Sequence, residues 1–582
     1  MENWWTTVGA EEWSDAIVAS MKLGGIDNLF FVSGSELVFY QEAIARAKEK
    51  GWPAPRLVTL IHENVALHAA IGNAMVRNQP AATAVHVDAG TLNQGAAIHT
   101  AWRGGYPVLM TAGAGPRAFP GSMPGAREAA VQWQQEPRDQ GEIVRQYTKM
   151  DHRLEHDDNP GLIVSRLLQI AMSEPQGPVY LTVPQETAML PLGGQAHFPT
   201  LGQLGVARPT WPDPADAEQI ARWLLDAETP VLFTTGAGRE PEAVQELIEL
   251  AELIAAPVMQ SGHTDRLNFP FTHWAAGTGP AASEADVAVV FEDIVPWIPG
   301  KTSPAADTKI AWVTADPVLS RYKTMEFRAD LWIPASIVGT ARAIREAAQR
   351  LMTSARRDAI DQRRHHLMAV KSEQDTRAEK LAFDELGKGA LNGRVVAYEL
   401  AKFMDKNTIV LNDGVSNQGF VREYARRELP GTYFRSGSST GGWGSGAAFG
   451  AKLGRPDSDV VHASGDGYFM FGSPLAALWA AQHHHAPYVA VVFVNGSYGT
   501  GTNSLKAAYP EGYAVREGSY DGGAFSPPPR FDKLAEAANS SGEYVTEFDQ
   551  LQPALKRAFD FTRDGTPALV AVRVPGPLDR AE

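Results

Sequence analysis

Short apolar runs rich in β-branched residues alternate with stretches of helical periodicity along this chain. In the first third the runs are 28–34 (NLFFVSG), 56–61 (RLVTLI), 81–87 (AATAVHV), 107–113 (PVLMTAG) and 178–184 (PVYLTVP). Between them lie segments such as 63–78, ENVALHAAIGNAMVRN, whose apolar positions recur at helical spacing. This alternation is typical of βα units on a parallel sheet. The pattern therefore predicts the α/β class, with doubly wound parallel sheets.

The same alternation recurs twice more. The later runs are 230–238, 257–260, 285–293 and 308–316, and then 407–414, 459–467, 488–496 and 567–575. A proline-dotted stretch, 190–214, is typical of a linker, and the charged stretch 354–380 of a solvated connecting helix. We therefore expect three α/β domains with two connections between them. The expected bounds are 1–190, 213–352 and 385–582 for the domains, 191–212 for a linker and 353–384 for a connecting helix or linker.

The composition narrows the class of protein. The chain has 582 residues and 44% hydrophobic content, and it is too long to fold around a single hydrophobic core. Its length agrees with domains of about 150 residues each. The formal net charge is −15 and no block of Lys and Arg stands out, so nucleic acid is not an expected partner. Because the chain has no cysteine, disulfides, thiolate metal ligands and thiol nucleophiles are excluded.

The compartment can also be predicted. The N-terminal sequence MENWWTTVGAEEW has no basic segment followed by an apolar core, and no apolar run approaches the length of a membrane span. The absence of cysteine permits a reducing compartment. We therefore expect a cytoplasmic protein that does not bind a membrane.

One candidate site lies in 463–472, ASGDGYFMFG, where Asp466 stands between two glycines directly after an apolar run. Ligands of open parallel sheets gather at the carboxyl ends of strands. Glycines there allow backbone amides to approach an anion, and a single carboxylate suits Mg²⁺, which prefers a few protein oxygens together with phosphate oxygens. Asp466 would then hold a metal ion that binds a diphosphate. An isolated Gly-Asp-Gly is, however, more often only a turn.

The neighbouring predicted strand supplies a second oxygen ligand. After Asp466 come a helix-like segment, the apolar run 487–494 (PYVAVVFV) and then Asn495. Side chains at adjacent strand ends, bridged by a helix whose N-terminus faces the same crevice, can form a metal-diphosphate site. The context therefore favours a binding site over a turn.

Gly-Asp-Gly followed by 27 residues and Asn495 resembles the signature of thiamin diphosphate (ThDP) enzymes. The resemblance covers essentially the whole chain, in the order pyrimidine-binding, central and diphosphate-binding domain. It implies that Mg²⁺ is bound by Asp466, Asn495 and the carbonyl of Ser497. Val494 replaces the first Asn of a pair that the family often has, and Tyr468 stands where Ser is frequent.

The resemblance also implies further contacts to the cofactor. The segment 412–419, NDGVSNQG, is similar to the one that contacts the diphosphate, so Ser416 and Asn417 are candidates; either could instead be an ordinary polar loop residue. A family residue that supports the bent cofactor aligns with Gly441 or, after a small shift, with Trp443. The remaining implied cofactor-binding residues are Glu63, Gly465, Asp466, Gly467, Tyr468, Asn495, Ser497 and Tyr498.

Activation of the pyrimidine ring requires a carboxyl group in a poorly solvated pocket. In 62–74, HENVALHAAIGNA, Glu63 follows an apolar run at the start of a predicted helix, where a carboxylate can also merely stabilise the helix dipole. The segment is similar to the family segment that carries the activating glutamate. The resemblance therefore implies that Glu63 is catalytic, and that Glu63 and Asp466 of one site come from different subunits.

The stretch 83–102, TAVHVDAGTLNQGAAIHTAW, resembles benzoylformate decarboxylase and implies a catalytic role in proton transfer for His86. The stretch 30–39, FFVSGSELVF, likewise aligns Ser35 with a substrate-binding serine. Seen alone, His86 could equally be a structural histidine at a strand end. The second active-site histidine of that enzyme has no counterpart here, and Trp297 is the nearest bulky residue.

These features predict a ThDP- and Mg²⁺-dependent carbon–carbon lyase or ligase that acts on a 2-oxoacid by decarboxylation, by acyl transfer to an aldehyde, or by both. The alternatives are a 2-hydroxy ketone or 2-hydroxyacyl-CoA lyase or synthase, an acetolactate-synthase-like carboligase, and a non-catalytic regulatory subunit. The last is disfavoured because Glu63, Asp466 and Asn495 are all present. The resemblance implies homodimers or dimers of dimers that act on a small-molecule substrate.

Overall fold

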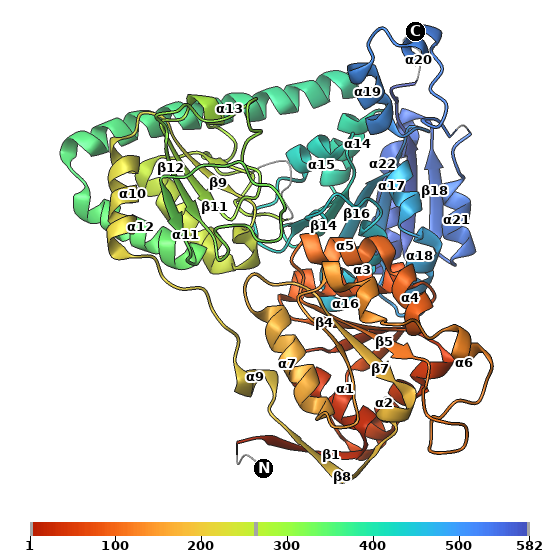
Figure 1. Ribbon diagram of the computed structural model, residues 1–582. Helices are drawn as coiled ribbons and strands as arrows, with labels where there is room; N and C mark the ends of the chain where they lie inside the picture. The colour runs from red at the N-terminus through yellow and green to blue at the C-terminus, as the bar shows by residue number, and fades with distance from the viewer. Residues whose placement is uncertain (1–3, 261–265, 526, 579–582) are drawn as a thin grey trace.

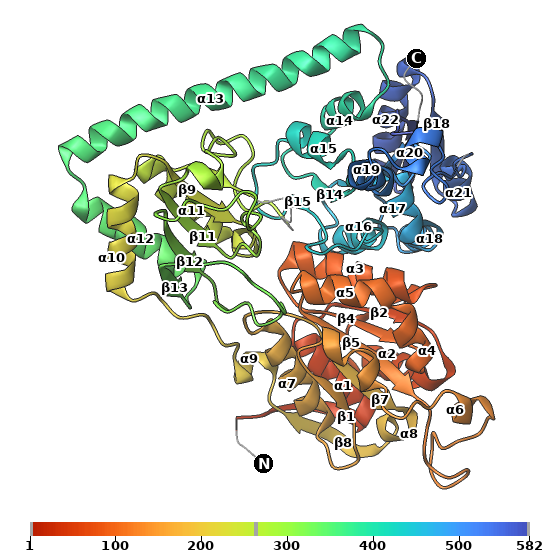
Figure 2. The ribbon, with the colours of Figure 1, turned by 45° about the horizontal axis from the view of Figure 1, so that its top comes forward.

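The computed structural model describes residues 4–260, 266–525 and 527–578. The chain forms an N-terminal, a central and a C-terminal domain, each built on one parallel sheet with helices around it (Figure 1). The N-terminal and C-terminal domains contact each other, and the central domain lies to one side of both (Figure 2). This architecture confirms the expected fold class.

The N-terminal domain has a six-stranded parallel sheet in the order β3-β2-β4-β5-β7-β6. Its strands are β2 (Asn28–Val32), β3 (Arg56–Leu60), β4 (Ala81–Val85), β5 (Val108–Ala114), β6 (Asp151–Arg153) and β7 (Val179–Pro184). Its α-helices are α1 (Trp13–Leu23), α2 (Val38–Lys50), α3 (Glu63–Arg77), α4 (Val87–Asn93), α5 (Gly95–Arg103), α6 (Val131–Gln134), α7 (Pro160–Met172) and α8 (Gln185–Ala188). Every residue of β4, β5 and β7 is buried, because helices cover both faces of the sheet.

A separate two-stranded ribbon corrects the expected linker. Strand β1 (Thr6–Glu12) pairs antiparallel with β8 (Pro191–Phe198), so the first part of the proline-dotted stretch is a strand. The short helix α9 (Leu201–Leu204) follows, and residues 205–213 then lead without regular structure into the central domain. The pattern did not indicate a strand because half of the eight residues of β8 are polar or glycine and its partner, β1, lies at the other end of the domain's sequence.

The central domain has a five-stranded parallel sheet in the order β10-β9-β11-β12-β13. Its strands are β9 (Pro230–Thr234), β10 (Val258–Met259), β11 (Val287–Phe291), β12 (Lys309–Val313) and β13 (Leu331–Ile333), and its helices are α10 (Pro214–Asp226), α11 (Pro241–Ile254) and α12 (Ile337–Leu351). Trp297 packs edge-to-face against Phe233, Trp312 and Phe327. Trp297 is therefore a core residue of this domain.

Helix α13 (Ser354–Gly387) connects the central domain to the C-terminal domain as one continuous helix of 34 residues (Figure 2). Three of its residues, Ile360, Leu367 and Ala382, are buried, and most of its other residues are polar or charged, although Met368, Leu381 and Phe383 are exposed apolar side chains. Arg363 anchors it by donating hydrogen bonds to backbone carbonyls at the end of α11 and in the segment after α10. The stretch expected as a connecting helix or linker thus lies almost wholly within α13.

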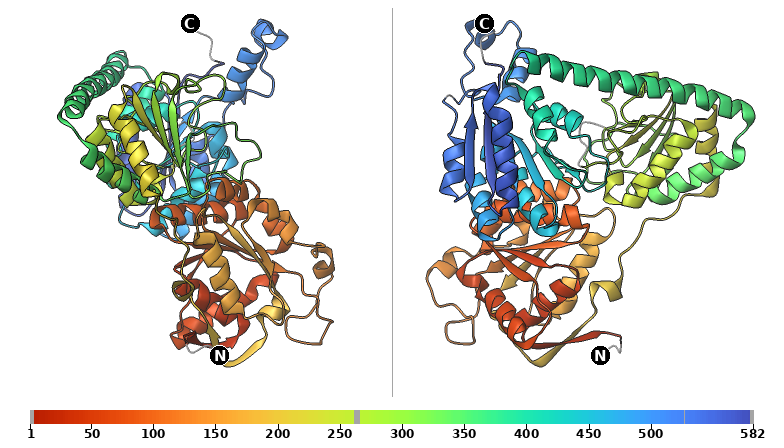
Figure 3. Two further views of the ribbon diagram at one scale, coloured as in Figure 1. Left: turned by 60° about the vertical axis from the view of Figure 1, so that its left-hand side comes forward. Right: turned by 180° about the vertical axis from the view of Figure 1, so that it is seen from behind.

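The C-terminal domain has a six-stranded parallel sheet in the order β15-β14-β16-β17-β19-β18, seen from behind in Figure 3. Its strands are β14 (Ile409–Asp413), β15 (Tyr433–Phe434), β16 (Val460–Gly465), β17 (Val489–Val494), β18 (Ser541–Val545) and β19 (Ala568–Arg573). Its helices are α14 (Gly393–Ala401), α15 (Gln418–Ala425), α16 (Gly444–Gly454), α17 (Asp466–Phe471), α18 (Pro474–His483), α19 (Gly499–Ala508), α20 (Tyr513–Glu517), α21 (Phe531–Ala537) and α22 (Phe548–Arg563). Counted from the first strand of each sheet, this order is the same as in the N-terminal domain.

Helices α3 and α16 join the N-terminal and C-terminal domains through small residues. A Cβ added to Gly72 would come within 2.1 Å of the Ala447 carbonyl oxygen, and one added to Gly450 within 1.9 Å of the Ala69 carbonyl oxygen. The two backbones can approach this closely only because glycines stand at the contact. Asn73 strengthens it by donating a hydrogen bond of 3.1 Å to the carbonyl of Gly450. One apolar cluster consequently runs through both domains.

The apolar runs of the sequence correspond to β2–β5, β7, β9–β12, β14, β16, β17 and β19, which confirms those predictions. The strands that the sequence did not reveal are β1, β6, β8, β13, β15 and β18. Within 4–260, 266–525 and 527–578, no helix combines the length and the apolar content that a membrane span needs.

Candidate functional site

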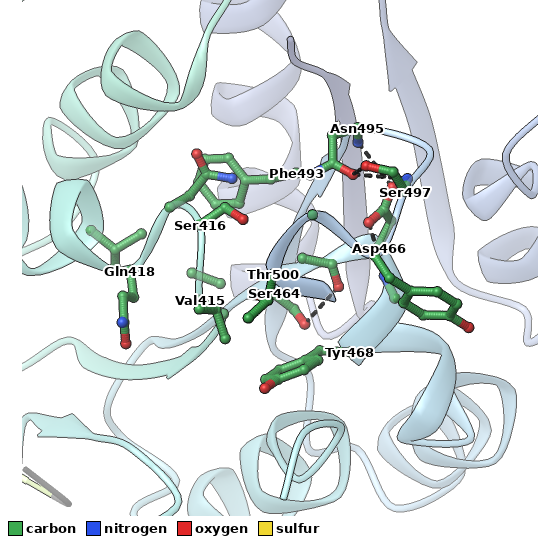
Figure 4. A pocket seen from close by; sticks show the side chains of 18 of the residues that line it. Val415, Ser416, Gln418, Ser464, Asp466, Tyr468, Phe493, Asn495, Ser497 and Thr500 are labelled. Carbon is green, nitrogen blue, oxygen red and sulfur yellow. Dashed lines mark hydrogen bonds between the residues drawn. The ribbon is translucent and has the colours of Figure 1, made fainter. Parts of the chain in front are cut away.

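Three adjacent strands of the C-terminal sheet end at a pocket (Figure 4). These strands are β14, β16 and β17, and the described residues that line the pocket lie between Asn412 and Thr500. Open parallel sheets bind ligands at such carboxyl ends. Asp466 and Asn495, the two signature residues, both line this pocket. The structure therefore brings them together as the sequence predicted.

Asp466 is fixed by backbone groups. Its Oδ2 accepts hydrogen bonds from the backbone N–H of Asn495 at 2.9 Å and of Gly496 at 2.7 Å, and its Oδ1 accepts one from Gly467 at 2.8 Å. Burial raises the pKa of Asp466, and these backbone hydrogen bonds oppose the rise. Each carboxylate oxygen can accept two bonds, so Oδ2 is fully used by these donors and Oδ1 keeps a lone pair for a cation.

Asn495 and Ser497 lie on the turn that follows β17. Asn495 Oδ1 accepts hydrogen bonds from the Ser497 backbone N–H at 2.9 Å and from the Ser497 hydroxyl at 3.0 Å. Between them Gly496 has φ +67°, a conformation that favours glycine. Val494 is fully buried in the strand, so Asn495 is the residue of this segment that presents an amide oxygen to the pocket.

The backbone around the pocket leaves room for an anion. A Cβ added to Gly465 would meet no atom within 4 Å, and one added to Gly414 would lie 3.7 Å from the backbone nitrogen of Gly465. Ser416 is exposed and Asn417 partly so, and both line the pocket. Oxygen ligands beside glycine backbone suit a divalent cation and a diphosphate. The residues present therefore fit a Mg²⁺-diphosphate cofactor.

Two aromatic rings, Tyr468 and Tyr498, form walls of the pocket (Figure 4 labels the first). A Cβ added to Gly441 would lie within 2.5 Å of the Tyr468 ring, so this ring fills the space that a side chain at 441 would need. Trp443 is 1% exposed and belongs to the core. Of the two candidates for supporting the cofactor, Gly441 thus borders the pocket wall and Trp443 does not.

A second group of predicted residues lies in the N-terminal domain. Ser35 follows β2, Glu63 follows β3 and His86 follows β4, and these three strands are neighbours in the sheet. Neighbouring strands lie about 4.8 Å apart. The three catalytic candidates of this domain therefore share one edge, although they are far apart in the sequence.

Glu63 begins α3 but does not cap it. The N-cap is His62, whose Nδ1 accepts a hydrogen bond of 3.2 Å from the backbone N–H of Asn64. The partly buried Glu63 carboxylate instead accepts a hydrogen bond from the side-chain amide of Asn93, at the end of α4. His62 thus caps the helix, and Glu63, in the first turn of α3, lies where a carboxylate also stabilises the helix dipole.

Two carboxylates of these strand ends were not singled out from the sequence. Glu36 is fully buried directly after Ser35, and one of its oxygens lies 3.2 Å from His86 Nδ1. Asp413, also buried, accepts hydrogen bonds from the backbone N–H of Gly442 at 3.1 Å and of Gly444 at 3.0 Å. The sequence signal that could have revealed these two residues is a charged residue next to an apolar strand or helix. A carboxylate that is buried there requires specific partners.

Taken together, the fold and these two edges define an α/β enzyme class. Its C-terminal sheet presents oxygen-bearing side chains and glycine backbone that fit a cation and a diphosphate, and its N-terminal sheet presents groups that can transfer protons. The comparisons with known proteins narrow this class to one superfamily.

Two family descriptions match the chain: "Thiamine pyrophosphate enzyme, N-terminal TPP binding domain" over residues 12–143 and "Thiamine pyrophosphate enzyme, C-terminal TPP binding domain" over residues 413–572. The acetolactate synthase large subunit of Mycobacterium tuberculosis is 27% identical over 563 residues, which cover 96% of this chain and 94% of that protein. Benzoylformate decarboxylase of Pseudomonas aeruginosa is 26% identical over 458 residues, which cover 76% of this chain and 80% of that protein.

A solved structure shows the same fold. The ThDP-dependent 4-hydroxybenzoylformate decarboxylase of Rhodococcus jostii has a TM-score of 0.75 at 19% identity, covering 98% of this chain and 100% of that chain. The chain belongs to the ThDP-dependent enzyme superfamily, in the group that includes acetolactate synthase and benzoylformate decarboxylase. The resemblance noted in the sequence is thereby confirmed.

Proposed function

We propose that the protein is a ThDP- and Mg²⁺-dependent lyase or ligase that breaks or forms the carbon–carbon bond next to the carbonyl of a 2-oxoacid. The reaction is decarboxylation, acyl transfer to an aldehyde, or both. The observation that carries this proposal is the shared edge of β3, β2 and β4, where Ser35 and His86 lie beside Glu63. The similarity to benzoylformate decarboxylase supports a 2-oxoacid as the substrate class.

The C-terminal edge would hold the cofactor. Asp466, Asn495 and the carbonyl of Ser497 would bind Mg²⁺, since these are the hard oxygen ligands that this ion prefers. When bound, ThDP supplies a carbon nucleophile that adds to the substrate carbonyl and then accepts the electron pair of the cleaved bond. The further cofactor contacts would come from the pocket residues Ser416, Asn417, Gly465, Gly467, Tyr468 and Tyr498.

The N-terminal edge would move protons. Glu63 would exchange a proton with the pyrimidine ring, and His86 would deliver or remove a proton at the reacting substrate. The Ser35 hydroxyl donates a hydrogen bond of 2.6 Å to Glu36 Oε2. Ser35 would bind the substrate carboxylate by turning this hydroxyl toward it.

Each complete site would combine two copies of the chain. The described residues that line the cofactor pocket all belong to the C-terminal domain, whereas Glu63 and His86 belong to the N-terminal one. Exposed apolar side chains flank both edges, and patches of this kind mark protein contacts. They are Met470, Phe471, Leu475 and Tyr498 in the C-terminal domain, 42–55% exposed, and Val38, Ile61 and Leu92 in the N-terminal domain, 43–61% exposed. We therefore propose a homodimer as the minimum unit, which a dimer of dimers also contains.

Other reactions of the group remain alternatives to this proposal. Trp297 is a core residue, so the position aligned with the second decarboxylase histidine supplies no proton-transfer group. This difference favours a 2-hydroxy ketone or 2-hydroxyacyl-CoA lyase or synthase as the second candidate. The similarity to acetolactate synthase supports a carboligase as the third.

A substrate panel separates these candidates. The protein loaded with ThDP and Mg²⁺ is incubated with 2-oxoacids that carry aromatic or bulky acyl groups and with benzoin-type ketols, while release of CO₂ and aldehyde is measured. The proposal expects CO₂ from at least one 2-oxoacid. Cleavage of ketols with no CO₂ from any 2-oxoacid would instead support the lyase.

A further inference from the structure

We infer that Glu36 is a positioning residue, whose buried carboxylate holds His86 with Nδ1 directed into the protein and Nε2 left for the reacting substrate. The inference rests on the proposed function, because it concerns proton transfer at the same edge. It adds a carboxylate–imidazole pair to the residues already assigned there.

The burial of the two groups defines which ring atom is available. Glu36 is 0% exposed, and its Oε2 lies 3.2 Å from His86 Nδ1. Nδ1 is itself buried and makes no aligned hydrogen bond, so this carboxylate is its electrostatic partner. The His86 side chain nevertheless remains 27% exposed, and because Nδ1 is buried, this exposure lies on its other atoms. The ring thus faces the carboxylate on one side and the outside of the domain on the other.

The backbone around the pair leaves this arrangement little freedom. A Cβ added to Gly34 would lie 2.3 Å from His86 Nδ1, and one added to Gly113 would lie 2.8 Å from the Glu36 carbonyl oxygen. Val87, directly after the histidine, has φ +29°, a strained conformation for a β-branched residue. Strain of this kind persists where the surrounding structure imposes it, and it concentrates at functional sites.

Two uncharged side chains donate hydrogen bonds to the Glu36 carboxylate. The Ser35 hydroxyl donates to Oε2 at 2.6 Å, and Gln132 Nε2 lies 3.4 Å from Oε1. Gln132 is held in turn, because its Oε1 accepts hydrogen bonds from the backbone N–H of Glu128 and Ala129. None of these donors carries a charge, so His86 is the group that can neutralise the buried carboxylate.

This geometry has a direct chemical consequence. A carboxylate beside Nδ1 favours a proton on that nitrogen, which leaves the lone pair of the neutral ring on Nε2. The charged ring that forms when Nε2 takes up a proton would lie beside the Glu36 carboxylate. Glu36 therefore prepares His86 to accept a proton at Nε2 and to return it.

The first test needs no substrate. The tautomer of each histidine is measured by ¹⁵N NMR on the full-length protein, for the wild type, Glu36→Gln and Glu36→Asp, with the His86 signals assigned from His86→Ala. Removing the negative charge should shift the population of neutral His86 from the Nδ1–H tautomer toward the Nε2–H tautomer, because a carboxylate beside Nδ1 favours a proton on that nitrogen. Glu36→Asp should restore part of the shift, and the exposed His365 should not change.

The second test is kinetic and uses the matched variant Glu42→Gln, whose side chain is 66% exposed on α2. Glu36→Gln should lower the single-turnover rate by about 10- to 10²-fold with ThDP affinity retained, less than His86→Ala does. In the double variant, Glu36→Gln should lower the single-turnover rate little below that of His86→Ala alone, because Glu36 acts through the histidine.

The outcomes distinguish this inference from the proposed function. An unchanged His86 tautomer in Glu36→Gln, or a fully additive double variant, would overturn the positioning role. A shifted tautomer in a protein that releases no CO₂ from any 2-oxoacid would uphold the pair of Glu36 and His86 and refute the proposed substrate class.

Discussion

The N-terminal and C-terminal sheets share one strand order but present different chemistry at equivalent strand ends. Counted from the first strand of each sheet, both orders read 2-1-3-4-6-5. The residue directly after the third strand is His86 in the N-terminal sheet and Asp466 in the C-terminal sheet. After the first strand stand Ser35 and Glu36 in the one, and Gly414 in the other. The N-terminal edge thus presents side chains that can exchange protons. The C-terminal edge presents glycine backbone and a carboxylate that backbone hydrogen bonds hold in place.

This difference shows how one topology serves two tasks. The sheets and the helices that cover them form the apolar core, whereas strand-end loops can change their residues without disturbing it. Helices α3 and α16 occupy equivalent places, since each follows the second strand of its sheet, and they pack directly on one another. The two edges are therefore held in a fixed relation by the most closely packed contact between the domains.

Removing the carboxylate of the C-terminal edge should have the largest effect. Asp466→Ala is expected to lower ThDP affinity in the presence of Mg²⁺ by about 10²-fold or more, with activity lost in parallel, because the diphosphate is bound chiefly through the ion. Isothermal calorimetry measures the affinity, and Asp457→Ala, at an exposed aspartate of the same domain, is the control. Unchanged ThDP binding in Asp466→Ala would refute the metal assignment.

Removing the Glu63 carboxylate from the N-terminal edge should lower turnover without weakening cofactor binding. Glu63→Gln keeps the shape of the side chain but cannot relay a proton, so turnover should fall by about 10²-fold or more while ThDP affinity stays near that of the wild type. Steady-state kinetics and calorimetry on the same preparation test this prediction, with Glu42→Gln as the control variant. Nearly full activity would mean that the cofactor is activated by another group.

The contact between the domains should respond to an added methyl group. Gly450→Ala places a Cβ against the Ala69 carbonyl and should destabilise the protein by about 1–3 kcal/mol through overpacking. Gly387→Ala, at the end of α13, meets no atom within 4 Å and should not lower the melting temperature. Equal melting temperatures for the two variants would show that the domains tolerate a looser contact.

The smallest expected effect is a pH dependence at the same helix pair. His68 on α3 is buried, and burial lowers its pKa to about 3 from an ordinary value of 6.5. Between these pH values the unfolded chain binds a proton that the folded protein does not, so stability falls as pH drops below about 6.5. His68→Gln should flatten the decline of the melting temperature between pH 7 and pH 5. An equally steep decline in the variant would assign the acid sensitivity to other groups.

The sequence predicted those parts of the fold that burial alone determines. A parallel strand covered on both faces must be apolar throughout, and for this reason β4, β5 and β17 could be recognised. Strands β13 and β15 have three and two residues, too few for a periodic signal. The ribbon of β1 and β8 depends on pairing across the domain, which local patterning does not encode.

The candidate site also has one part that the sequence predicted and one part that it did not. Asp466 and Asn495 could be predicted because both stand at the ends of apolar strands that are adjacent in the sheet, separated in the sequence by two helices and one strand. Glu36 could not, because its contact with His86 arises only when β2 and β4 pair. Sequence motifs therefore reveal groups that bind the cofactor locally, and the structure is needed for side chains that act through a distant neighbour.

The central claim, that each site joins the N-terminal edge of one copy to the pocket of another, is tested most directly by combining two inactive variants. Glu63→Gln and Asp466→Ala are coexpressed with different tags, and the mixed dimer is purified. One of its two sites then contains native Glu63 from one chain and native Asp466 from the other, so about half of the wild-type activity should return. If both residues of a site came from the same chain, the mixed dimer would be as inactive as either parent, and the claim would be contradicted.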